Sequence, residues 1–381
     1  DHIAGTMNWT VTTNHLVMLY VAMEASTLAT ALLVAFYRNR PSLEAGFKYV
    51  LLVVVGMTFA LFGVVLMFSA AYPHLGSAGL LISEVGRIAA VIPKNIALLA
   101  IAFLTVGFAT KAGLVPFHAW LPDAHSEAPA PISALLSGLI IKLGAYALTR
   151  TVTIFAPTYH AIVVFIAILS TLSMVVGIVM ALAQDDLKRM LAFSSVSQIS
   201  YVFEGLGLGT YLGIYGGLFH LVNHTIIKAL LFLSVGALMY ATQGRRRISE
   251  LAGVGKRMPI TAFSFIVGAL AISGLPPMNG FASKFTLFLA IGEVGLYWAL
   301  ALSLFTGLLT LACLMRAAYL VFWQAGDNGT VHTVKKAPWP MSVAMLVLAG
   351  LCLLIGLYPN LLYPILHQAT TAVLAIWSVG Q

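Results

Sequence analysis

Charge is scarce in this chain of 381 residues: only 8% are Asp, Glu, Lys or Arg, against about a quarter in an ordinary soluble domain. Because 60% of the residues are apolar and the mean hydropathy is +0.98, a soluble enzyme and a disordered chain are both excluded. The 20 basic residues outnumber the 12 acidic ones, but they are thinly spread between apolar runs. This pattern is typical of a membrane protein and not of a nucleic-acid-binding protein.

Cysteine is also scarce, and the usual marks of a cofactor site are missing. Cys313 and Cys352 lie in apolar runs without a nearby Cys or His, which predicts two buried small side chains and no disulfide or zinc site. Gly205, Gly207 and Gly209 lie in an apolar run with no strand before them, so they do not form a dinucleotide site. We therefore expect no cofactor, no metal ion and no catalytic centre in this chain.

Long apolar runs dominate the sequence. A helix needs about 20 apolar residues to cross the hydrocarbon core, and this rule predicts an all-α polytopic membrane protein with about eleven spans. The expected spans are 15–37, 47–70, 95–115, 131–150, 161–183, 190–208, 211–240, 259–290, 296–322, 341–358 and 361–378. No stretch between them is long enough for a separate domain, so residues 1–381 are expected to form a single transmembrane domain.

The basic residues divide unevenly between alternate loops. One side holds eleven of them: Arg38, Arg40, Lys188, Arg189, Arg245, Arg246, Arg247, Lys256, Arg257, Lys335 and Lys336. The other side holds Arg87, Lys94 and Arg150. Cytoplasmic loops carry the excess of Lys and Arg, so eleven spans predict an external N-terminal end and a cytoplasmic C-terminus.

Two expected spans are interrupted by proline. The third runs into Lys111-Ala-Gly-Leu-Val-Pro116, and the eighth is broken at Gly274-Leu-Pro-Pro-Met-Asn-Gly280. The breaks lie five spans apart, so the two helices run in opposite directions. Discontinuous helices of opposite direction are typical of inverted repeats around an ion path. We expect residues 15–150 and 161–322 to form these repeats, followed by C-terminal helices at 341–378.

Several ionisable residues lie inside the expected spans, where each costs on the order of 3 kcal/mol on insertion scales. They are Glu24, Lys111, Lys142, His220, His224, Lys228 and Lys284. The residues of span seven stand at i, i+4 and i+8 and therefore share one helical face. Because imidazole titrates near neutral pH, the set as a whole favours a proton relay through the membrane.

Two other interpretations apply to single members of this set or to their neighbours. Long side chains can extend to the membrane interface or form static ion pairs, which is the better explanation for Arg316, Arg150 and Lys48. The spacing of His220 and His224 is also found in zinc sites, but a third ligand and the catalytic Glu of metalloproteases are missing.

Four stretches resemble the antiporter-like membrane subunits of respiratory NADH:quinone oxidoreductase, membrane-bound [NiFe] hydrogenase, formate hydrogenlyase and Mrp cation/proton antiporters. They begin at Thr110 (TKAGLVPFHAWLPDAHSEAP), Gln184 (QDDLKRMLAFSSVSQI), Phe219 (FHLVNHTIIKALLFL) and Ser273 (SGLPPMNGFASK). Their order matches the family over about residues 15–322, and the sequence of the last stretch most resembles hydrogenase-type subunits.

The resemblance implies a role for each buried ionisable residue. Glu24 would be the glutamate of the fifth family helix and would form a switching pair with Lys111 of the seventh. Lys142, on the eighth, and the histidines would pass the proton towards Lys284 on the discontinuous twelfth. Since span one then corresponds to the fifth family helix, and Asp1 is not an initiator Met, the N-terminal family helices are expected to be missing.

The resemblance also implies an assembly in the cytoplasmic (inner) cell membrane. Other antiporter-like and small membrane subunits and a peripheral redox arm would surround this subunit in the lipid bilayer, with no nucleic acid. Two alternatives remain open: a subunit of an Mrp-type Na⁺/H⁺ antiporter without redox chemistry, and a structural spacer with static charges.

Overall fold

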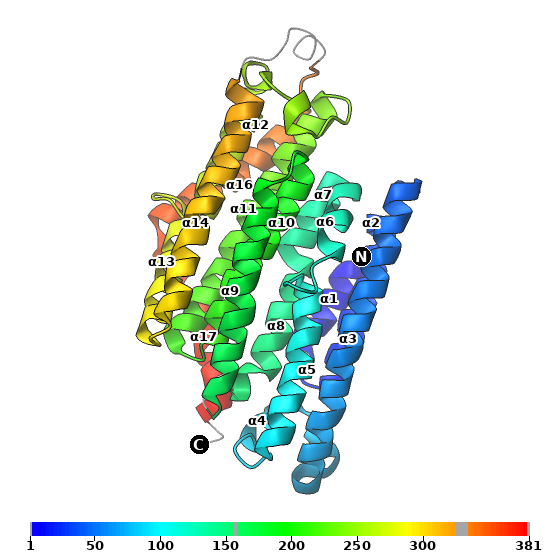
Figure 1. The fold of residues 1–381 in the computed structure, drawn as a ribbon, viewed down its shortest axis with the longest axis vertical. Helices are drawn as coiled ribbons and strands as arrows, with labels where there is room; N and C mark the ends of the chain where they lie inside the picture. The colour runs from blue at the N-terminus through cyan, green and yellow to red at the C-terminus, as the bar shows by residue number, and fades with distance from the viewer. Residues whose placement is uncertain (1, 156–157, 325–333, 379–381) are drawn as a thin grey trace.

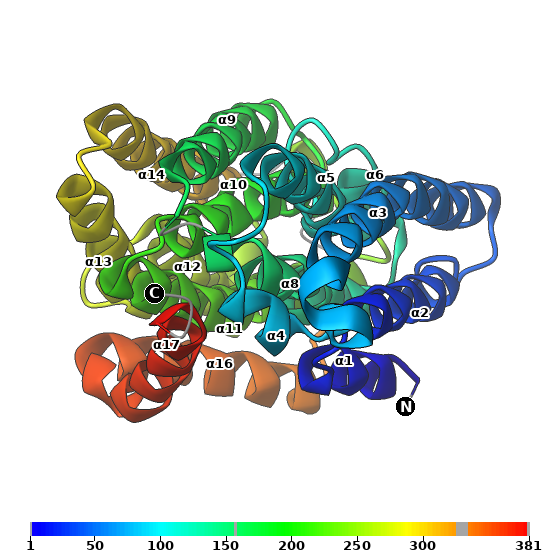
Figure 2. The same cartoon turned by 90° about the horizontal axis from the view of Figure 1, so that it is seen from below.

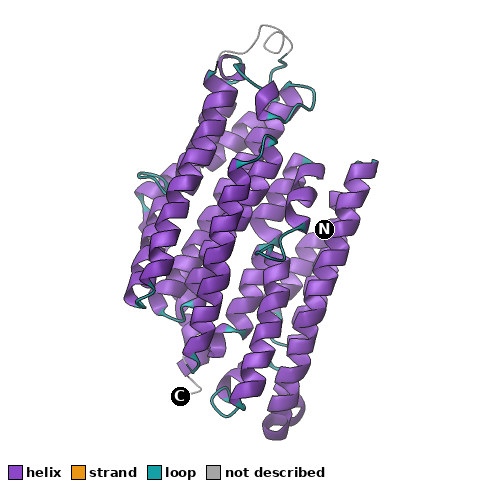
Figure 3. Cartoon of the chain, in the orientation of Figure 1, coloured by secondary structure: helices purple, strands orange, loops and turns teal. Residues whose placement is uncertain are grey.

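A computed structural model describes residues 2–155, 158–324 and 334–378, and its regular structure over these ranges is helical (Figure 3). Two isolated β-bridges, His15 to Leu81 and Asp186 to Arg247, are the only extended pairings within the described residues.

The helices of the first half are α1 (His2–Thr12), α2 (Leu16–Val34), α3 (Arg40–Leu75), α4 (Ile82–Arg87), α5 (Lys94–Ala112), α6 (Trp120–Glu127), α7 (Ala130–Leu135) and α8 (Lys142–Thr151). Those of the second half are α9 (His160–Leu182), α10 (Leu187–Gly207), α11 (Tyr211–Ala241), α12 (Pro259–Ser273), α13 (Asn279–Glu293), α14 (Tyr297–Ala318), α16 (Trp339–Leu357) and α17 (Tyr363–Ser378). The short helix α1 was not expected from the sequence.

Eight helices of the described residues are long and apolar enough to cross a membrane. They include α2, α3, α5, α9, α11 and α16, together with the segments Ala130–Thr151 and Tyr297–Trp323. The protein is therefore a multi-pass helical membrane protein. The other three expected spans coincide with α10, with the pair α12 and α13, and with α17, which are more polar or shorter.

The helices form a bundle whose two halves lie side by side (Figure 1). Seen along the bundle, α8, α10 and α11 lie in the middle, with α3, α5, α9 and α14 on one side and α1, α16 and α17 on the other (Figure 2). Small residues allow the closest approach: a Cβ on Gly56 of α3 would lie 2.3 Å from Thr110, and one on Gly107 of α5 would lie 2.4 Å from Ala60. Such contacts are typical of helix packing in membranes, where interfaces are rich in small side chains.

Helices α5 and α12 end in the same way, at the two sites where the sequence predicts breaks. Gly113 and Gly274 follow the last helical residues with φ of 76° and 83°, a left-handed conformation that favours glycine. The amides of Leu114 and Leu275 then donate to the carbonyls of Ala109 and Leu270, at 2.9 and 3.2 Å. The backbone groups at each break are thus partly satisfied within the chain itself, as membrane depth requires.

A third irregularity was not expected. Residues Leu136–Ile140 form a π-helical turn between α7 and α8, directly before Lys142. The amide of Ile141 donates to the carbonyl of Leu136 at 3.2 Å, five residues back. A π-turn changes the direction of the residues that follow it and is frequent at functional sites.

The C-terminal helices do not follow the expected alternation. An added Cβ on Gly356, at the end of α16, would lie 2.0 Å from the carbonyl oxygen of Pro277, so α16 ends against the break between α12 and α13. Helix α17 then packs against α11, α4 and the short helix η3 (Thr153–Phe155). Its end therefore lies with Arg87 and Arg150 and not with the eleven basic residues, contrary to the expectation from eleven separate spans (Figure 1).

Candidate functional site

Five helices carry the buried ionisable residues, and they follow one another across the bundle. From right to left in Figure 2 the order is α2, α5, α8, α11 and α13. These helices carry Glu24, Lys111, Lys142, the group His220, His224 and Lys228, and Lys284, respectively. Every one of these side chains except Glu24, which is partly exposed, is buried.

Lys111 lies in the last turn of α5, directly before the break, and points at helix α2. Its ammonium group donates to Thr27 Oγ1 at 2.7 Å and to the carbonyl oxygen of Met23 at 3.3 Å. Tyr49 Oη lies 3.5 Å away on α3. Within the described residues the carboxylate of Glu24 forms no ion pair, and its Oε1 has no hydrogen-bond partner. Lys111 thus contacts the turn of α2 that carries Glu24, but not its carboxylate.

Lys142 contacts another member of this row directly. Its Nζ lies 2.6 Å from Nδ1 of His224 and also donates to the carbonyl oxygen of Ser137 in the π-helical turn. The side chain is only 6% exposed. Because His224 belongs to α11, this contact joins the two halves of the chain directly.

The shared face of α11 meets three different helices. His224 contacts Lys142 of α8, whereas His220 Nδ1 lies 3.1 Å from Ser283 Oγ of α13. Lys228 donates to Ser194 Oγ of α10 at 2.5 Å and to the carbonyl oxygen of Leu191 at 2.8 Å. The rings of His220 and His224 stack with their centroids 6.2 Å apart, so the helix offers consecutive ionisable groups.

Lys284 follows the second break and is buried without a hydrogen bond in the described part of the chain. Its ammonium group lies 4.5 Å from the centre of the Tyr201 ring, a cation–π distance. It also lines a cavity of about 500 Å³ whose other walls include Ser273, Phe285 and Leu308. The ring of Tyr201 in turn lies 5.6 Å from that of His220, which connects Lys284 to the face of α11.

Two further buried groups lie beside the row. His125 of α6 is fully buried, stacks on Phe232 at 4.8 Å, and has no hydrogen bond at either ring nitrogen within the described residues. Glu204 of α10 is 1% exposed and accepts from Ser303 Oγ and Thr171 Oγ1, at 3.1 and 3.4 Å. Glu204 is not among the residues singled out from the sequence, although a carboxylate inside an apolar run is a signal that could have identified it.

No group of three or more His, Cys, Asp or Glu residues in the described segments has an arrangement that would hold a metal ion. The two histidines of α11 are engaged with Lys142 and Ser283 instead. Cys313 and Cys352 are buried and unpaired.

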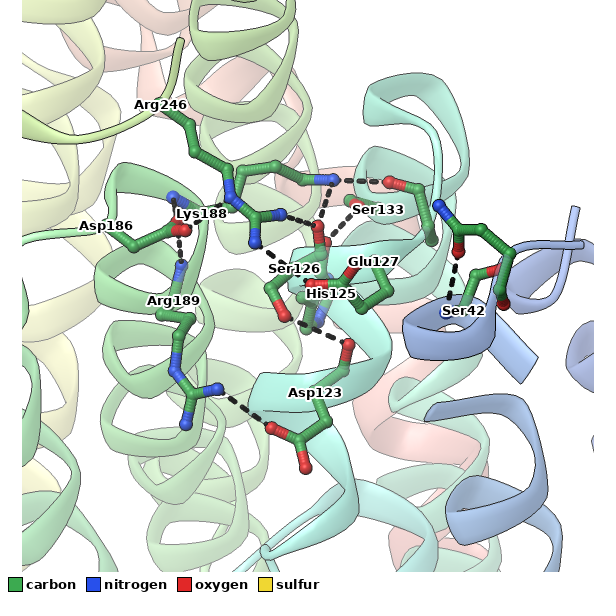
Figure 4. Close-up of polar contacts among 12 residues, drawn as sticks. Ser42, Asp123, His125, Ser126, Glu127, Ser133, Asp186, Lys188, Arg189 and Arg246 are labelled. Carbon is green, nitrogen blue, oxygen red and sulfur yellow. Dashed lines mark hydrogen bonds and ion pairs between the residues drawn. The ribbon is translucent and has the colours of Figure 1, made fainter. Parts of the chain in front are cut away.

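An ion-pair cluster closes one end of the bundle next to α6 (Figure 4). Asp123 of α6 contacts Lys48 at 2.6 Å and Arg189 at 2.9 Å. Arg246 contacts Asp186 at 2.6 Å and Glu127 at 3.0 Å, and it also donates to the carbonyl oxygen of Ser126 at 2.6 Å. The cluster joins α3, α6, α10 and the segment after α11, and so holds α6 over the interior.

Replacing Arg246 with Met should therefore lower the thermal stability of the detergent-solubilised protein. The change leaves two partly buried carboxylates without their ion-pair partner and removes one of the two donors to the Ser126 carbonyl, at a cost of roughly 1–2 kcal/mol. The control is Arg87→Met, which removes an exposed pair with Glu84 and should change the unfolding midpoint little. Equal shifts for both variants would contradict this role of Arg246.

Comparison with known proteins was consistent with the family resemblance. A family model described as "NADH:quinone oxidoreductase/Mrp antiporter, TM" matches residues 13–310. A hydrogenase-4 component F homolog of Methylacidiphilum infernorum is 34% identical over 285 residues, covering 73% of this chain and 59% of the relative. A Na⁺/H⁺ antiporter subunit of Alkalihalophilus pseudofirmus is 34% identical over 350 residues, covering 92% of this chain and 69% of the relative.

Among solved structures, a chain of the membrane-bound sulfane sulfur reductase, an archaeal respiratory membrane complex, superposes with a TM-score of 0.89 at 29% identity. The match covers 100% of this chain and 76% of that one. The chain spans about three fifths of the length of the first curated relatives it matches.

Proposed function

We propose that this chain, which belongs to the family of membrane subunits shared by NADH:quinone oxidoreductases and Mrp antiporters, translocates protons within a redox-driven membrane complex. The observation that carries the proposal is the row of buried ionisable side chains across five helices, joined at its centre by the 2.6 Å contact of Lys142 with His224. Groups that bind protons and are linked by hydrogen bonds are sufficient for such transfer.

The proposed mechanism is electrostatic. Lys111 is held by neutral oxygens of Thr27 and Met23 on the same turn of α2 as Glu24. The ammonium group of Lys111 would have two positions, one against Thr27 and Met23 and one against the Glu24 carboxylate. A charge that arrives beside α2 would favour one of them over the other. The change of charge at Lys111 then acts on Lys142, and the proton passes through His224 and the other ionisable groups of α11 towards Lys284.

The proposal places the end of the bundle that carries the ion-pair cluster in the cytoplasm, by the excess of basic residues. Helix α10 and the broken helix α12–α13 would cross the membrane in addition to the eight apolar spans. Helix α17 would continue from α16 towards the external side and not return. The matching ends of α5 and α12 support inverted repeats, with residues 15–150 and 161–322 as the two units.

The implied partners are other antiporter-like and small membrane subunits, together with a peripheral redox arm that contains the cofactors. The redox reaction would take place in that arm, and this chain would contribute only the proton path. The sulfane sulfur reductase described as a respiratory membrane complex supports an assembly of this kind.

A second candidate function is a subunit of an Mrp-type Na⁺/H⁺ antiporter without redox chemistry. The 34% identity to the Alkalihalophilus antiporter protein over 92% of this chain favours it. Both functions would use the same buried residues, so the energy source decides between them. Everted vesicles that contain the whole complex can be energised with NADH, with hydrogen or with an imposed sodium gradient, and only the gradient should drive the antiporter.

We expect Lys111→Ala and Glu24→Gln to lower proton uptake roughly tenfold in vesicles with the assembled complex, because each removes one partner of the charge switch. The measurement is the quenching of a pH-sensitive dye, normalised to the amount of complex. Glu44→Gln, on an exposed turn at the start of α3, is the matched control. Proton uptake at the wild-type rate in both variants would sink the proposal.

A further inference from the structure

Glu204 is a buried carboxylate for which the row of lysines and histidines has no assigned part. It lies on α10, three residues before the helix ends, at the end of the bundle opposite the ion-pair cluster. Its relative exposure is 1%, and every neighbour that bonds to it within the described residues is a hydroxyl group. No Lys, Arg or His nitrogen of the described segments forms an ion pair with it.

An ionised carboxylate that is buried without a cation is costly, and uptake of a proton removes that cost. The helices packed around Glu204 contribute Thr171 from α9 and Ser303 from α14 as its hydrogen-bond donors. Met174 Sδ lies 3.6 Å from the same Ser303 hydroxyl. These neighbours can solvate either form of a carboxyl group, but none of them can neutralise a carboxylate.

Three hydroxyl groups lie between Glu204 and the end of the row. Tyr201 stands one turn before Glu204 on the same face of α10. Its Oη donates to the carbonyl oxygen of Ser303 at 2.6 Å and lies 2.7 Å from Thr306 Oγ1, while Ser303 Oγ reaches the carboxylate at 3.1 Å. The ammonium group of Lys284 lies 4.5 Å from the Tyr201 ring. Tyr201 thus lies between the two residues: its ring contacts Lys284, and its hydroxyl bonds to Ser303, whose own hydroxyl bonds to Glu204.

We propose that Glu204 accepts the proton released by Lys284 and passes it towards the external end of the bundle. In this step Lys284 changes from ammonium to neutral amine and Glu204 from carboxylate to carboxylic acid, so the proton and the total charge balance. The hydroxyl groups of Tyr201, Thr306 and Ser303 line the route between them, with water as the carrier where two groups are not in direct contact. This inference rests on the proposed function, since it extends the same row by one residue.

The test compares Glu204→Gln with Glu204→Asp in the assembled complex, in vesicles energised with its own electron donor or ion gradient. Gln keeps the size of the side chain and can bond to Ser303 and Thr171, but it cannot carry a proton. We expect Glu204→Gln to lower proton translocation about tenfold or more and Glu204→Asp to retain most of it. The control is Glu293→Gln, an exposed glutamate at the same end of the bundle. Wild-type translocation in Glu204→Gln overturns the inference.

An infrared difference spectrum reports protonation of Glu204 directly and would show no such signal if Glu204 had only a structural role. When the state of the complex is switched, the wild-type protein should show the carbonyl band of a carboxylic acid that gains or loses a proton, and Glu204→Gln should lack it. If Glu204→Gln does not assemble, Ser303→Ala takes its place and should shift that band, because it removes a donor to the same carboxyl. An unshifted band, or a loss of transport that added sodium ions restore, overturns the inference.

Failure of this inference can be distinguished from failure of the proposed function. Lys142→Leu is measured in the same series, and its contact with His224 lies well before Glu204 in the row. If Lys142→Leu blocks translocation and Glu204→Gln does not, only the role of Glu204 is wrong. If Lys142→Leu translocates at the wild-type rate, the relay itself is wrong.

Discussion

In complexes that carry Lys142→Leu, proton translocation should fall by about two orders of magnitude while the complex still assembles. Lys142 is buried at the start of α8, and its ammonium group is the only one in the described chain within hydrogen-bond distance of His224. Leu fills a similar volume without a proton-binding group. It removes the cost of burying an ammonium group, which offsets part of the cost of leaving His224 Nδ1 and the Ser137 carbonyl without this partner. Loss of function without loss of assembly is therefore expected.

The control for this variant is Lys94→Met. Lys94 opens α5, is exposed, and lies at the end of the bundle that carries few basic residues. The Lys94→Met variant should translocate protons at the wild-type rate. This result would show that the defect of Lys142→Leu comes from the position of Lys142 and not from the loss of a positive charge in general. The alternative of a structural spacer makes the opposite prediction, because static charges can be removed from a spacer without uncoupling. Equal rates in Lys142→Leu and the control would favour the spacer.

Much of the arrangement around Lys142 could be predicted from the sequence. The i, i+4, i+8 spacing places His220, His224 and Lys228 on one face of α11, and the prolines mark where α5 and α12 end. These features depend on local backbone geometry, which a short stretch of sequence specifies. The family resemblance, carried by the same stretches, was confirmed by the family model over residues 13–310.

The partners of these residues could not be predicted. The π-helical turn before Lys142 contains no proline that would indicate it, and both α7 and the turn itself pack against α11. The ammonium group of Lys111 is held away from Glu24 by the carbonyl oxygen of Met23 and the hydroxyl of Thr27 on α2. The polar setting of Glu204 comes from α9 and α14, far away in sequence. Such contacts are tertiary, so hydropathy and periodicity do not reveal them.

The end of the bundle at which α17 terminates also could not be predicted from the sequence. An apolar run of 18 residues at 361–378 was interpreted as a crossing because length and composition were the only observations. In the structure α16 ends against the break near Pro277, and α17 continues along α11 to α4. A prediction that counts each apolar run as one full crossing cannot anticipate that α16 ends at the break between α12 and α13 and that α17 continues in the same direction.

Replacing Gly280 with Ala should prevent the second half of the bundle from closing and so reduce the amount of assembled complex severalfold. Gly280 is the second residue of α13, directly after the break, and an added Cβ would lie 1.8 Å from the carbonyl oxygen of Ala271 in α12. That oxygen belongs to backbone and cannot turn away as a flexible side chain would. Overpacking of this kind costs about 3 kcal/mol or more, a large part of the stability of a typical domain.

The same substitution should also displace the end of the proton path. Asn279, beside Gly280, is joined to Asn223 of α11 by hydrogen bonds of 2.9 and 3.1 Å, which fix the start of α13. Lys284 stands one turn after Gly280 on the same face, so a shift of α13 moves its ammonium group from the Tyr201 ring. Any complex that still assembles with Gly280→Ala should therefore translocate protons more slowly per assembled molecule.

Gly292→Ala is the matched control, because it adds the same methyl group to the same helix. Its Cβ would meet only Leu300 at 3.8 Å, an ordinary contact, and Ala in place of Gly favours the helix. Assembly can be measured from the complex recovered in detergent, and stability from its thermal unfolding. Gly292→Ala should match the wild-type protein in both measurements. Normal assembly of Gly280→Ala would mean that α12 and α13 can separate at the break, and the close approach of the two half-helices would then not be required for the fold.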